Sequence, residues 1–308
     1  MSDGAGDVLV LRALGLGDAL TGIAALRGVR RAWPDRRLVL AAPLLLGEWL
    51  RRLEVVDAVV PTTGLAPLPA APRPYVAVNL HGRGPQSHAV LQATQPQALV
   101  AFRCAEAGFD RGPVWRREEH EVLRWCRLVA STGGRCGPED LRLSTHERRG
   151  SQVIVHPGAA SPARRWPEDR WRQLVTALGG SGRRIVVTGT PAEAEVCRRV
   201  AAVSPAAGVA VGLSLDGLAD LVAAAALVVS GDTGVAHLAT AYATPSVTMF
   251  GPTPPTWWGP ALDPHLHAVI WHGRDGEGGD PHGERVDPRL AGVEVAEVLA
   301  AAHAQLAR

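Results

Sequence analysis

Residues 227–237 read Leu-Val-Val-Ser-Gly-Asp-Thr-Gly-Val-Ala-His, and the fold can be worked out from this stretch. The apolar, β-branched run at its start is typical of a buried strand. Gly231 and Gly234 bound a short turn, and the residues up to 243 have the apolar spacing of a helix. A strand that enters a helix through a glycine turn is the repeating unit of parallel α/β sheets.

The same alternation of strand and helix recurs along the whole chain. Strands are expected at 8–11, 38–42, 58–60, 75–80, 98–102, 153–156, 184–188, 227–230 and 246–250. Helices are expected at 19–33, 45–53, 118–131, 168–178, 191–203, 216–225 and 235–243. This order predicts doubly wound parallel sheets, which bind ligands outside the carboxyl ends of their strands.

The stretch 133–150 is polar, carries glycine and lacks periodicity, so it separates two halves of similar layout. We predict two Rossmann-like α/β domains facing each other across a cleft, at 1–148 and 149–290, followed by a helix at 291–308. The segments 61–74, with five prolines, and 271–288, crowded with glycine and acidic residues, are expected to be loops.

Composition narrows the class of protein. The chain has 308 residues, of which 46% are hydrophobic, and this is enough for two domains of about 150 residues each. Its 32 basic residues, all arginine, nearly balance 30 acidic ones, and they form no long basic block, so we expect no nucleic-acid partner.

The cysteines and the N-terminal residues indicate in which cellular compartment to expect the protein. The four cysteines show no C-x-x-C spacing, so neither a zinc site nor a disulfide framework is predicted. Residues 1–7 do not resemble a targeting signal, and no run of about 18 apolar residues follows. We expect a cytoplasmic protein with at most peripheral membrane contact.

The turn at 231–234 is a candidate anion site. A strand that ends in a glycine turn before a helix directs backbone N–H groups and the helix dipole at one point. Thr233 adds a hydroxyl, and His237 lies one turn into the helix. In the alternative interpretation, Asp232 or Thr233 only caps the helix and His237 is a core histidine. The turn alone does not separate the two.

Residues 156–167, after the predicted strand 153–156, form a second candidate. Ser161 and Arg164 could bring a hydroxyl and a guanidinium to a diphosphate. The alternative is a solvated loop in which Trp166 and Pro167 pack as the start of a helix.

The segment Gly15-Leu16-Gly17-Asp18 follows the first predicted strand. It lacks the G-x-G-x-x-G fingerprint because Leu20 takes the place of the third glycine, so a dinucleotide site is poorly supported. Asp18 is either a capping carboxylate or a general base. A helix N-terminus lowers the pKa of a carboxylate, so a basic Asp18 would need an enclosed site.

Polar residues also follow the predicted strand 75–80. His81, Arg83, Gln86 and Ser87 are candidates for binding an acceptor, and the alternative is a solvated loop.

In this order and spacing, the motifs resemble glycosyltransferase family 9, the ADP-heptose:lipopolysaccharide heptosyltransferases and their relatives. They are Leu16-Gly17-Asp18 with Ala25-Leu26-Arg27, His81-Gly82, His156-Pro157-Gly158 to Trp166-Pro167, Ser214-Leu215-Asp216-Gly217, Ser230 to His237, and Phe250-Gly251-Pro252-Thr253-Pro254. The resemblance implies a GT-B architecture, a donor bound mainly by the C-terminal domain, and inverting, metal-independent transfer. It also implies that the final helix packs back on the N-terminal domain.

The resemblance also implies roles for individual residues. Asp18 matches the proposed catalytic base, Arg164 a lysine that contacts the donor phosphate, and Asp216 a glutamate that bonds the donor ribose. The donor-binding turn is matched by Asp232, Thr233, Gly234 and His237. The chain departs from the family pattern at Ala24, Asn79, Arg164 and Asp216, and arginine in place of lysine keeps the charge that a phosphate needs.

These features predict a glycosyltransferase that moves a sugar, with heptose a candidate, from a nucleoside-diphosphate sugar to a hydroxyl of a glycan, lipid-linked or small-molecule acceptor. No cofactor is expected besides this donor substrate. The alternatives are a nucleotide-sugar epimerase or hydrolase on the same fold, and a non-catalytic sugar-nucleotide-binding protein.

Overall fold

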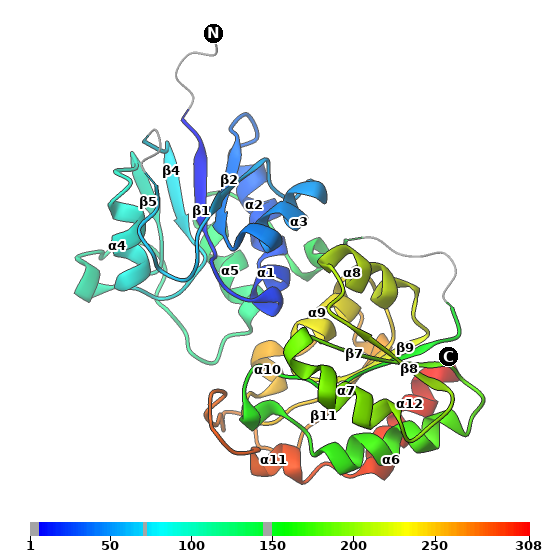
Figure 1. Ribbon diagram of the computed structural model, residues 1–308. Helices are drawn as coiled ribbons and strands as arrows, with labels where there is room; N and C mark the ends of the chain where they lie inside the picture. Colours follow the sequence, from blue (N-terminus) through cyan, green and yellow to red (C-terminus); the bar gives the residue numbers. More distant parts are fainter. Residues whose placement is uncertain (1–5, 70–72, 144–149) are drawn as a thin grey trace. The chain divides into compact units, whose positions relative to one another are not determined.

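The computed structural model describes residues 6–69, 73–143 and 150–308, and it divides into two compact units, 1–141 and 142–308 (Figure 1). The domain boundary predicted at 148/149 lies outside the described residues. The division into a domain at 149–290 and a separate helix at 291–308 stays a prediction.

The first unit is built on a five-stranded parallel sheet with the order β3-β2-β1-β4-β5. Its strands are β1 (Val8–Leu11), β2 (Leu38–Ala42), β3 (Ala58–Pro61), β4 (Val76–Asn79) and β5 (Ala98–Val100). Its α-helices are α1 (Leu16–Thr21), α2 (Ile23–Ala32), α3 (Leu44–Arg52), α4 (Gln86–Gln92) and α5 (Glu121–Ala130). The strand order reverses between β1 and β4, which is where ligands bind in open parallel sheets.

The second unit carries a six-stranded parallel sheet with the order β11-β10-β9-β6-β7-β8. Its strands are β6 (Val153–His156), β7 (Ile185–Gly189), β8 (Ala207–Val211), β9 (Leu227–Gly231), β10 (Ser246–Met249) and β11 (His267–Ile270). Its α-helices are α6 (Glu168–Gly179), α7 (Ala194–Ala201), α8 (Leu215–Ala224), α9 (Gly234–Ala241), α10 (Pro255–Trp258), α11 (Pro288–Ala291) and α12 (Val295–Leu306). Here the order reverses between β6 and β9.

The central strands consist of nearly continuous apolar residues because helices cover the sheets and leave no face to water. Every residue of β1 and of β6 is buried. In the second unit the core joins these strands to α6, α7 and α12. The predicted fold class, two doubly wound parallel α/β domains, is therefore confirmed.

Several elements differ from the sequence-based expectation. The helix expected at 19–33 is two helices, α1 and α2, which meet at Gly22. A Cβ atom on Gly22 would stand 2.6 Å from Cδ and Nε of Arg12, so no side chain fits there. The strands β8 and β11 were not predicted. Each is a partly buried edge strand, and alanine and glycine in β8 and alanine in β11 are residues with low strand propensity.

The C-terminal helix α12 packs on α6 and on the strands β9, β10 and β11 of its own unit. Its predicted contact with the N-terminal domain stays a prediction. The predicted loop 271–288 contains neither helix nor strand before Pro288. It is tied to the turn after β10, since Trp271 Nε1 donates to the carbonyl of Gly251 at 3.0 Å and Gly279 N donates to that of Pro252 at 2.6 Å.

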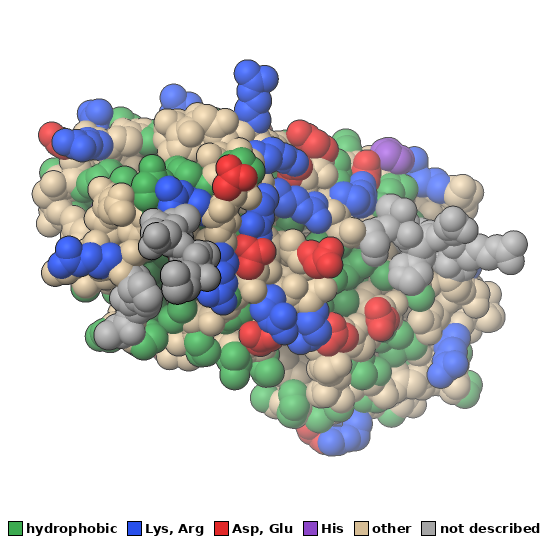
Figure 2. All heavy atoms as spheres, turned by 90° about the horizontal axis from the view of Figure 1, so that it is seen from above, with side chains coloured by type: hydrophobic (Ala, Val, Ile, Leu, Met, Phe, Trp, Pro, Cys, Tyr) green, Lys and Arg blue, Asp and Glu red, His purple; other side chains and the backbone are tan. Residues whose placement is uncertain are grey.

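No helix within the described ranges is long and apolar enough to span a membrane. On the face drawn in Figure 2, arginine and acidic side chains are interspersed, which agrees with the net charge of +2.

Candidate functional site

Two loops meet at the switch point of the second sheet. One follows β6 and carries Arg164, and the other is the turn between β9 and α9. The Arg164 guanidinium donates through Nη1 to the main-chain carbonyl of Asp232 at 3.4 Å. A Cβ atom on Gly231 would lie 3.3 Å from the Arg164 carbonyl, so a glycine allows the two backbones to approach closely. The structure thus brings together Arg164 and the 231–234 turn, which the sequence singled out separately.

Three buried polar atoms lie on residues of this switch point. Among the described residues, Thr233 Oγ1, Ser230 Oγ and Arg164 Nε are buried and have no hydrogen-bond partner. A buried polar group left unpaired costs about 1–3 kcal/mol. Three such atoms beside the N-terminus of one helix indicate a site that is completed by a polar ligand, and the helix dipole favours a negatively charged one.

Thr233 occupies the N-cap position of α9 with an extended backbone, at φ −143° and ψ 171°. Within the described parts of the chain its hydroxyl makes no capping hydrogen bond. Thr233 is thus the N-cap residue by position, as the alternative interpretation expected, but its hydroxyl does not cap the helix and can serve a ligand. The neighbouring Asp232 is buried, and its main-chain N donates to the Met249 carbonyl at 3.1 Å.

Other predicted donor residues lie around the turn. His237 is one turn into α9, and its ring lies edge-to-face to Trp258 with 5.9 Å between centroids. Asp216 is exposed in the first turn of α8, whose N-cap Ser214 accepts from Gly217 N at 3.1 Å. Since α8 follows a strand parallel to β9, this first turn lies at the same carboxyl edge of the sheet, and α8 packs against α9.

The Ser161 hydroxyl was expected to donate a hydrogen bond to a diphosphate, but the structure gives it another partner. Its side chain is buried, and its hydroxyl donates to the carbonyl of Pro281. A second hydrogen bond joins the same two segments, since Ala163 N donates to the carbonyl of Gly283 at 3.1 Å. The hydroxyl proton of Ser161 is thus committed to holding the 281–283 segment beside the Arg164 loop.

In the first unit, the loops after β1 and β4 meet at the switch point. Ala13 N donates to His81 Nδ1 at 3.2 Å, and Arg12 Nη1 donates to the Leu80 carbonyl. Asp18 lies in the first turn of α1, directly after the β1 loop.

Asp18 has the enclosure that a basic carboxylate needs. Burial raises its pKa, the positive charge of Arg12 acts against this increase, and the charge of Glu121 reinforces it. The Asp18 side chain remains 30% exposed, so substrate can reach it. Burial therefore outweighs the lowering that a helix N-terminus was expected to cause, and the carboxylate is a better base than an ordinary aspartate.

The four acceptor candidates differ in how far they are buried. Arg83 and Gln86 are exposed. His81 is half-buried, and burial together with the charge of Arg12 lowers its pKa, so its ring is neutral near pH 7 with the proton on Nε2. Ser87 is buried within α4 and accepts from Asn79 Nδ2 at 2.9 Å, so the solvated-loop alternative is wrong for this residue. Its part in binding an acceptor stays a prediction.

Sequence reasoning did not single out Arg12 or Glu121, and it named Ser230 only as the first residue of the motif Ser230 to His237. An arginine directly after the apolar run Val8–Leu11 is a detectable signal, because charged residues are seldom fully buried unless they are paired. The partner Glu121 stands 109 positions away, and neither pattern nor spacing connects it to Arg12.

The model of glycosyltransferase family 9 (heptosyltransferase) matches residues 114–273, just over half of the chain. Lipopolysaccharide heptosyltransferase 1 of Escherichia coli K12 is 33% identical over 149 residues, which cover 45% of this chain and 47% of that protein. The matched stretch thus spans about half the length of this curated relative.

Two solved structures cover nearly the whole chain. The E. coli ADP-heptose lps heptosyltransferase II has a TM-score of 0.78 and 22% identity, and it covers 98% of both chains. The E. coli heptosyltransferase WaaC with ADP has a TM-score of 0.74 and 20% identity, covering 97% of this chain and 99% of its own. These likenesses show the fold, and the family match shows the descent. The chain belongs to glycosyltransferase family 9.

Proposed function

We propose that this protein is a glycosyltransferase that moves a sugar from a nucleoside-diphosphate sugar to an acceptor hydroxyl. The observation that carries the proposal concerns three buried polar atoms on Arg164, Ser230 and Thr233, at the β6/β9 switch point beside the N-terminus of α9. None of the three has a hydrogen-bond partner among the residues that the structure describes. A diphosphate supplies the negative charge and the acceptor oxygens that such a site lacks.

The donor is held by the second unit. The diphosphate binds at the N-terminus of α9, where Thr233 and Arg164 donate to its oxygens, and the carboxylate of Asp216 accepts from ribose hydroxyls. ADP-heptose is the donor that we propose, since heptosyltransferases with this fold are named for it or were solved with ADP.

Transfer uses one residue of the first unit. Asp18 takes the proton of the acceptor hydroxyl, and the oxygen attacks the anomeric carbon as the bond to the diphosphate breaks. Attack opposite the leaving group inverts the anomeric centre. Arg164, Thr233 and the helix dipole stabilise the charge on the departing diphosphate, an effect worth about 2.7–4 kcal/mol for one preorganised donor in other enzymes.

The acceptor that we propose is a lipopolysaccharide core glycan, since the curated relatives are named lipopolysaccharide heptosyltransferases. Arg83 and Gln86 are exposed beside His81 and are available to its polar groups. A cytoplasmic location with peripheral membrane contact suits such a lipid-linked acceptor. We propose that transfer needs neither metal nor cofactor.

The test is to incubate the protein with ADP-heptose alone and with ADP-heptose plus a truncated lipopolysaccharide, and to measure ADP release and acceptor mass. Acceptor-dependent release with a gain of one heptose supports transfer. Release without acceptor indicates a hydrolase, a changed sugar indicates an epimerase, and binding without turnover indicates a non-catalytic protein. A repeat with a chelator present tests metal independence.

A further inference from the structure

Arg12 is buried next to Asp18 and holds its main chain. Its side chain is only 1% exposed, and its guanidinium donates through Nε to the main-chain carbonyl of Asp18 and through Nη1 to that of Leu80. Its Nη2 group donates to Thr21 Oγ1 at 3.0 Å. The arginine therefore fixes the backbone of α1 to the ends of β1 and β4.

The carboxylate of Asp18 is not the main partner of this guanidinium. Its Oδ1 lies 3.9 Å from Arg12 Nη2, beyond hydrogen-bond distance, whereas Glu121 Oε1 lies 3.1 Å from the same nitrogen. Glu121 is itself buried, and it is held by Arg124 Nη1 and by Trp125 Nε1, the latter at 2.6 Å. The carboxylate of Glu121 is thus shared between Arg12 and Arg124, and it offsets part of the charge of Arg12.

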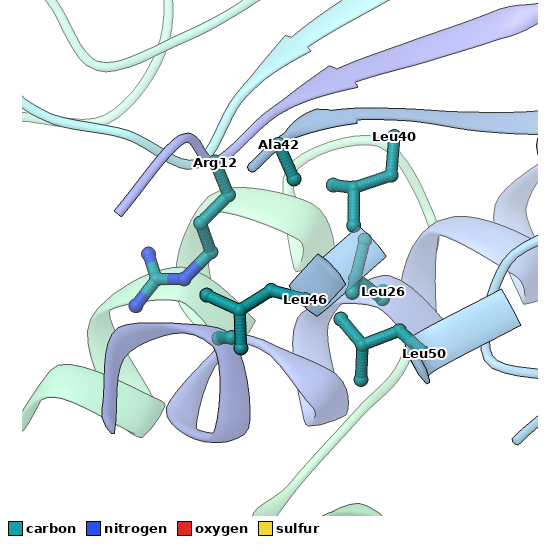
Figure 3. Close-up of a pocket in the computed structure, with 7 residues that line it drawn as sticks. Arg12, Leu26, Leu40, Ala42, Leu46 and Leu50 are labelled. Carbon is teal, nitrogen blue, oxygen red and sulfur yellow. The ribbon is translucent and has the colours of Figure 1, made fainter. Parts of the chain in front are cut away.

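Apolar side chains around Arg12 shield its interactions with Glu121 and Asp18 from water. The aliphatic part of Arg12 borders an apolar pocket, and its guanidinium points away from the pocket-lining leucines Leu26, Leu40, Leu46 and Leu50 (Figure 3). The guanidinium also lies 5.1 Å from the ring centroid of Trp125. Charges that are shielded from water act on each other more strongly than charges at a surface.

We propose that Arg12 and Glu121 are a positioning pair for the general base: Arg12 fixes the main chain that carries Asp18, and Glu121 offsets the charge of Arg12 so that the Asp18 carboxylate stays basic. This inference rests on the proposed function of Asp18. Neither residue touches substrate, and both act through Asp18.

The charged and titratable groups around Asp18 come from each neighbouring element. They are Arg12 from the end of β1, His81 from the loop after β4, and Glu121 with its partner Arg124 from α5. Burial has the largest effect on the pKa of Asp18. Since the ring of His81 is neutral near pH 7, Arg12 and Glu121 supply the opposing charges that adjust this pKa further.

The test measures the pH dependence of kcat/KM in variants that change one charge at a time. In Glu121→Gln the charge of Arg12 acts on Asp18 without compensation, so the acidic limb of the profile should move to lower pH by about one unit. In Arg12→Gln it should move to higher pH by a similar amount. Glu121→Asp retains the charge and should restore the limb to the wild-type position.

Glu119→Gln is the matched control. Glu119 lies only two positions from Glu121, and it also pairs with an arginine, Arg127. Its carboxylate is not a partner of Arg12. This variant should retain the acidic limb of the wild-type profile, and its turnover should stay within about twofold of wild type.

If either Gln variant at 12 or 121 fails to fold, Arg12→Lys decides. Lysine keeps the positive charge but loses the planar guanidinium that holds the main chain of Asp18. We therefore expect kcat to fall at least about tenfold, with KM and the acidic limb unchanged. Wild-type kcat in Arg12→Lys overturns the positioning role.

A carbon-13 NMR titration of the Asp18 carboxyl, assigned with Asp18→Asn, gives a readout that needs no substrate. Opposite displacements in Arg12→Gln and Glu121→Gln support the pair. Displacements of one sign, or none, overturn it. Opposite NMR displacements in a protein without transferase activity support the pair and refute the proposed function.

Discussion

Arg164 donates to the main-chain carbonyl of Asp232 across the switch point of the second sheet, with Nη1 3.4 Å from the oxygen. This contact joins the loop after β6 to the turn before α9 and leaves Nε of the same guanidinium buried without a partner within the described residues. A long interaction to a neutral carbonyl is readily exchanged for a short one to a phosphate. Arg164 is therefore both held in place and available.

Thr233→Val should separate ligand binding from stability. Valine has the shape of threonine and suits the extended backbone at this position, and it removes a buried hydroxyl that has no partner in the described residues. We expect the free energy of unfolding to be unchanged or higher. Affinity for ADP should fall about tenfold or more, because a hydrogen bond to a charged group contributes about 1.5–3 kcal/mol. Chemical denaturation and calorimetry measure the two quantities.

Thr240→Val, on the same helix, is the control for Thr233→Val. The hydroxyl of Thr240 donates to the Ala236 carbonyl at 3.3 Å, so its loss should lower stability slightly and leave ADP affinity unchanged. If the two variants behave alike, the hydroxyl of Thr233 has no binding role.

Asp18→Asn should reduce turnover by about 10²- to 10⁴-fold, the usual contribution of a general base. It should also raise the melting temperature near pH 7, by roughly 1–3 °C. Burial raises the pKa of Asp18, so the folded state prefers the protonated carboxyl. Its contribution to stability is complete below the ordinary aspartate pKa of about 3.9 and is lost as pH rises through the folded value.

The advantage of Asp18→Asn should therefore shrink as pH is lowered toward 4. Asp57→Asn gives the opposite sign. Burial acts against ionisation of Asp57, but hydrogen bonds from Arg30 and Leu38 N hold its pKa below the ordinary value. That variant should be less stable than wild type at pH 7. Thermal scans from pH 4 to 8 test both, and a lower melting temperature of Asp18→Asn at pH 7 would contradict the burial argument.

Gly22→Ala should displace Arg12 and, through it, the proposed general base Asp18. The backbone of Gly22 is helical at φ −79°, so alanine would otherwise be favoured, but its Cβ would meet Arg12 at 2.6 Å. We expect a loss of about 1–3 kcal/mol in the free energy of unfolding, typical of overpacking, together with lower kcat. Gly180→Ala, where the nearest atom to the Cβ is 3.4 Å away, should be neutral or stabilising by the same denaturation measurement.

The sheets were predictable because central parallel strands are continuous apolar runs. Val8–Leu11 and Val153–His156 begin and end where the sequence pattern places them. The position of the candidate site in the second unit was predictable from its glycine turn, since a strand, a turn and a helix in this order fix the sheet edge at which it lies. The role of this site in donor binding stays a prediction.

Other features depend on contacts between distant positions. The edge strand β8 consists of alanine, glycine and valine, so that its strand conformation depends on pairing with β7. The burial of Ser87 follows from the packing of Asn79, and the role of Arg12 depends on Glu121. No local pattern encodes such pairs.

Isothermal titration of ADP into the wild-type protein, Arg164→Ala and Arg165→Ala tests the donor site most directly. Arg165 is the adjacent arginine, but it is exposed and donates to the Ala159 carbonyl at 2.9 Å. We predict one ADP per wild-type chain, an affinity at least about tenfold weaker in Arg164→Ala, and wild-type affinity in Arg165→Ala. Equal affinity in all three proteins, or no binding of ADP or any other nucleoside diphosphate to the wild type, would contradict the assignment of this site.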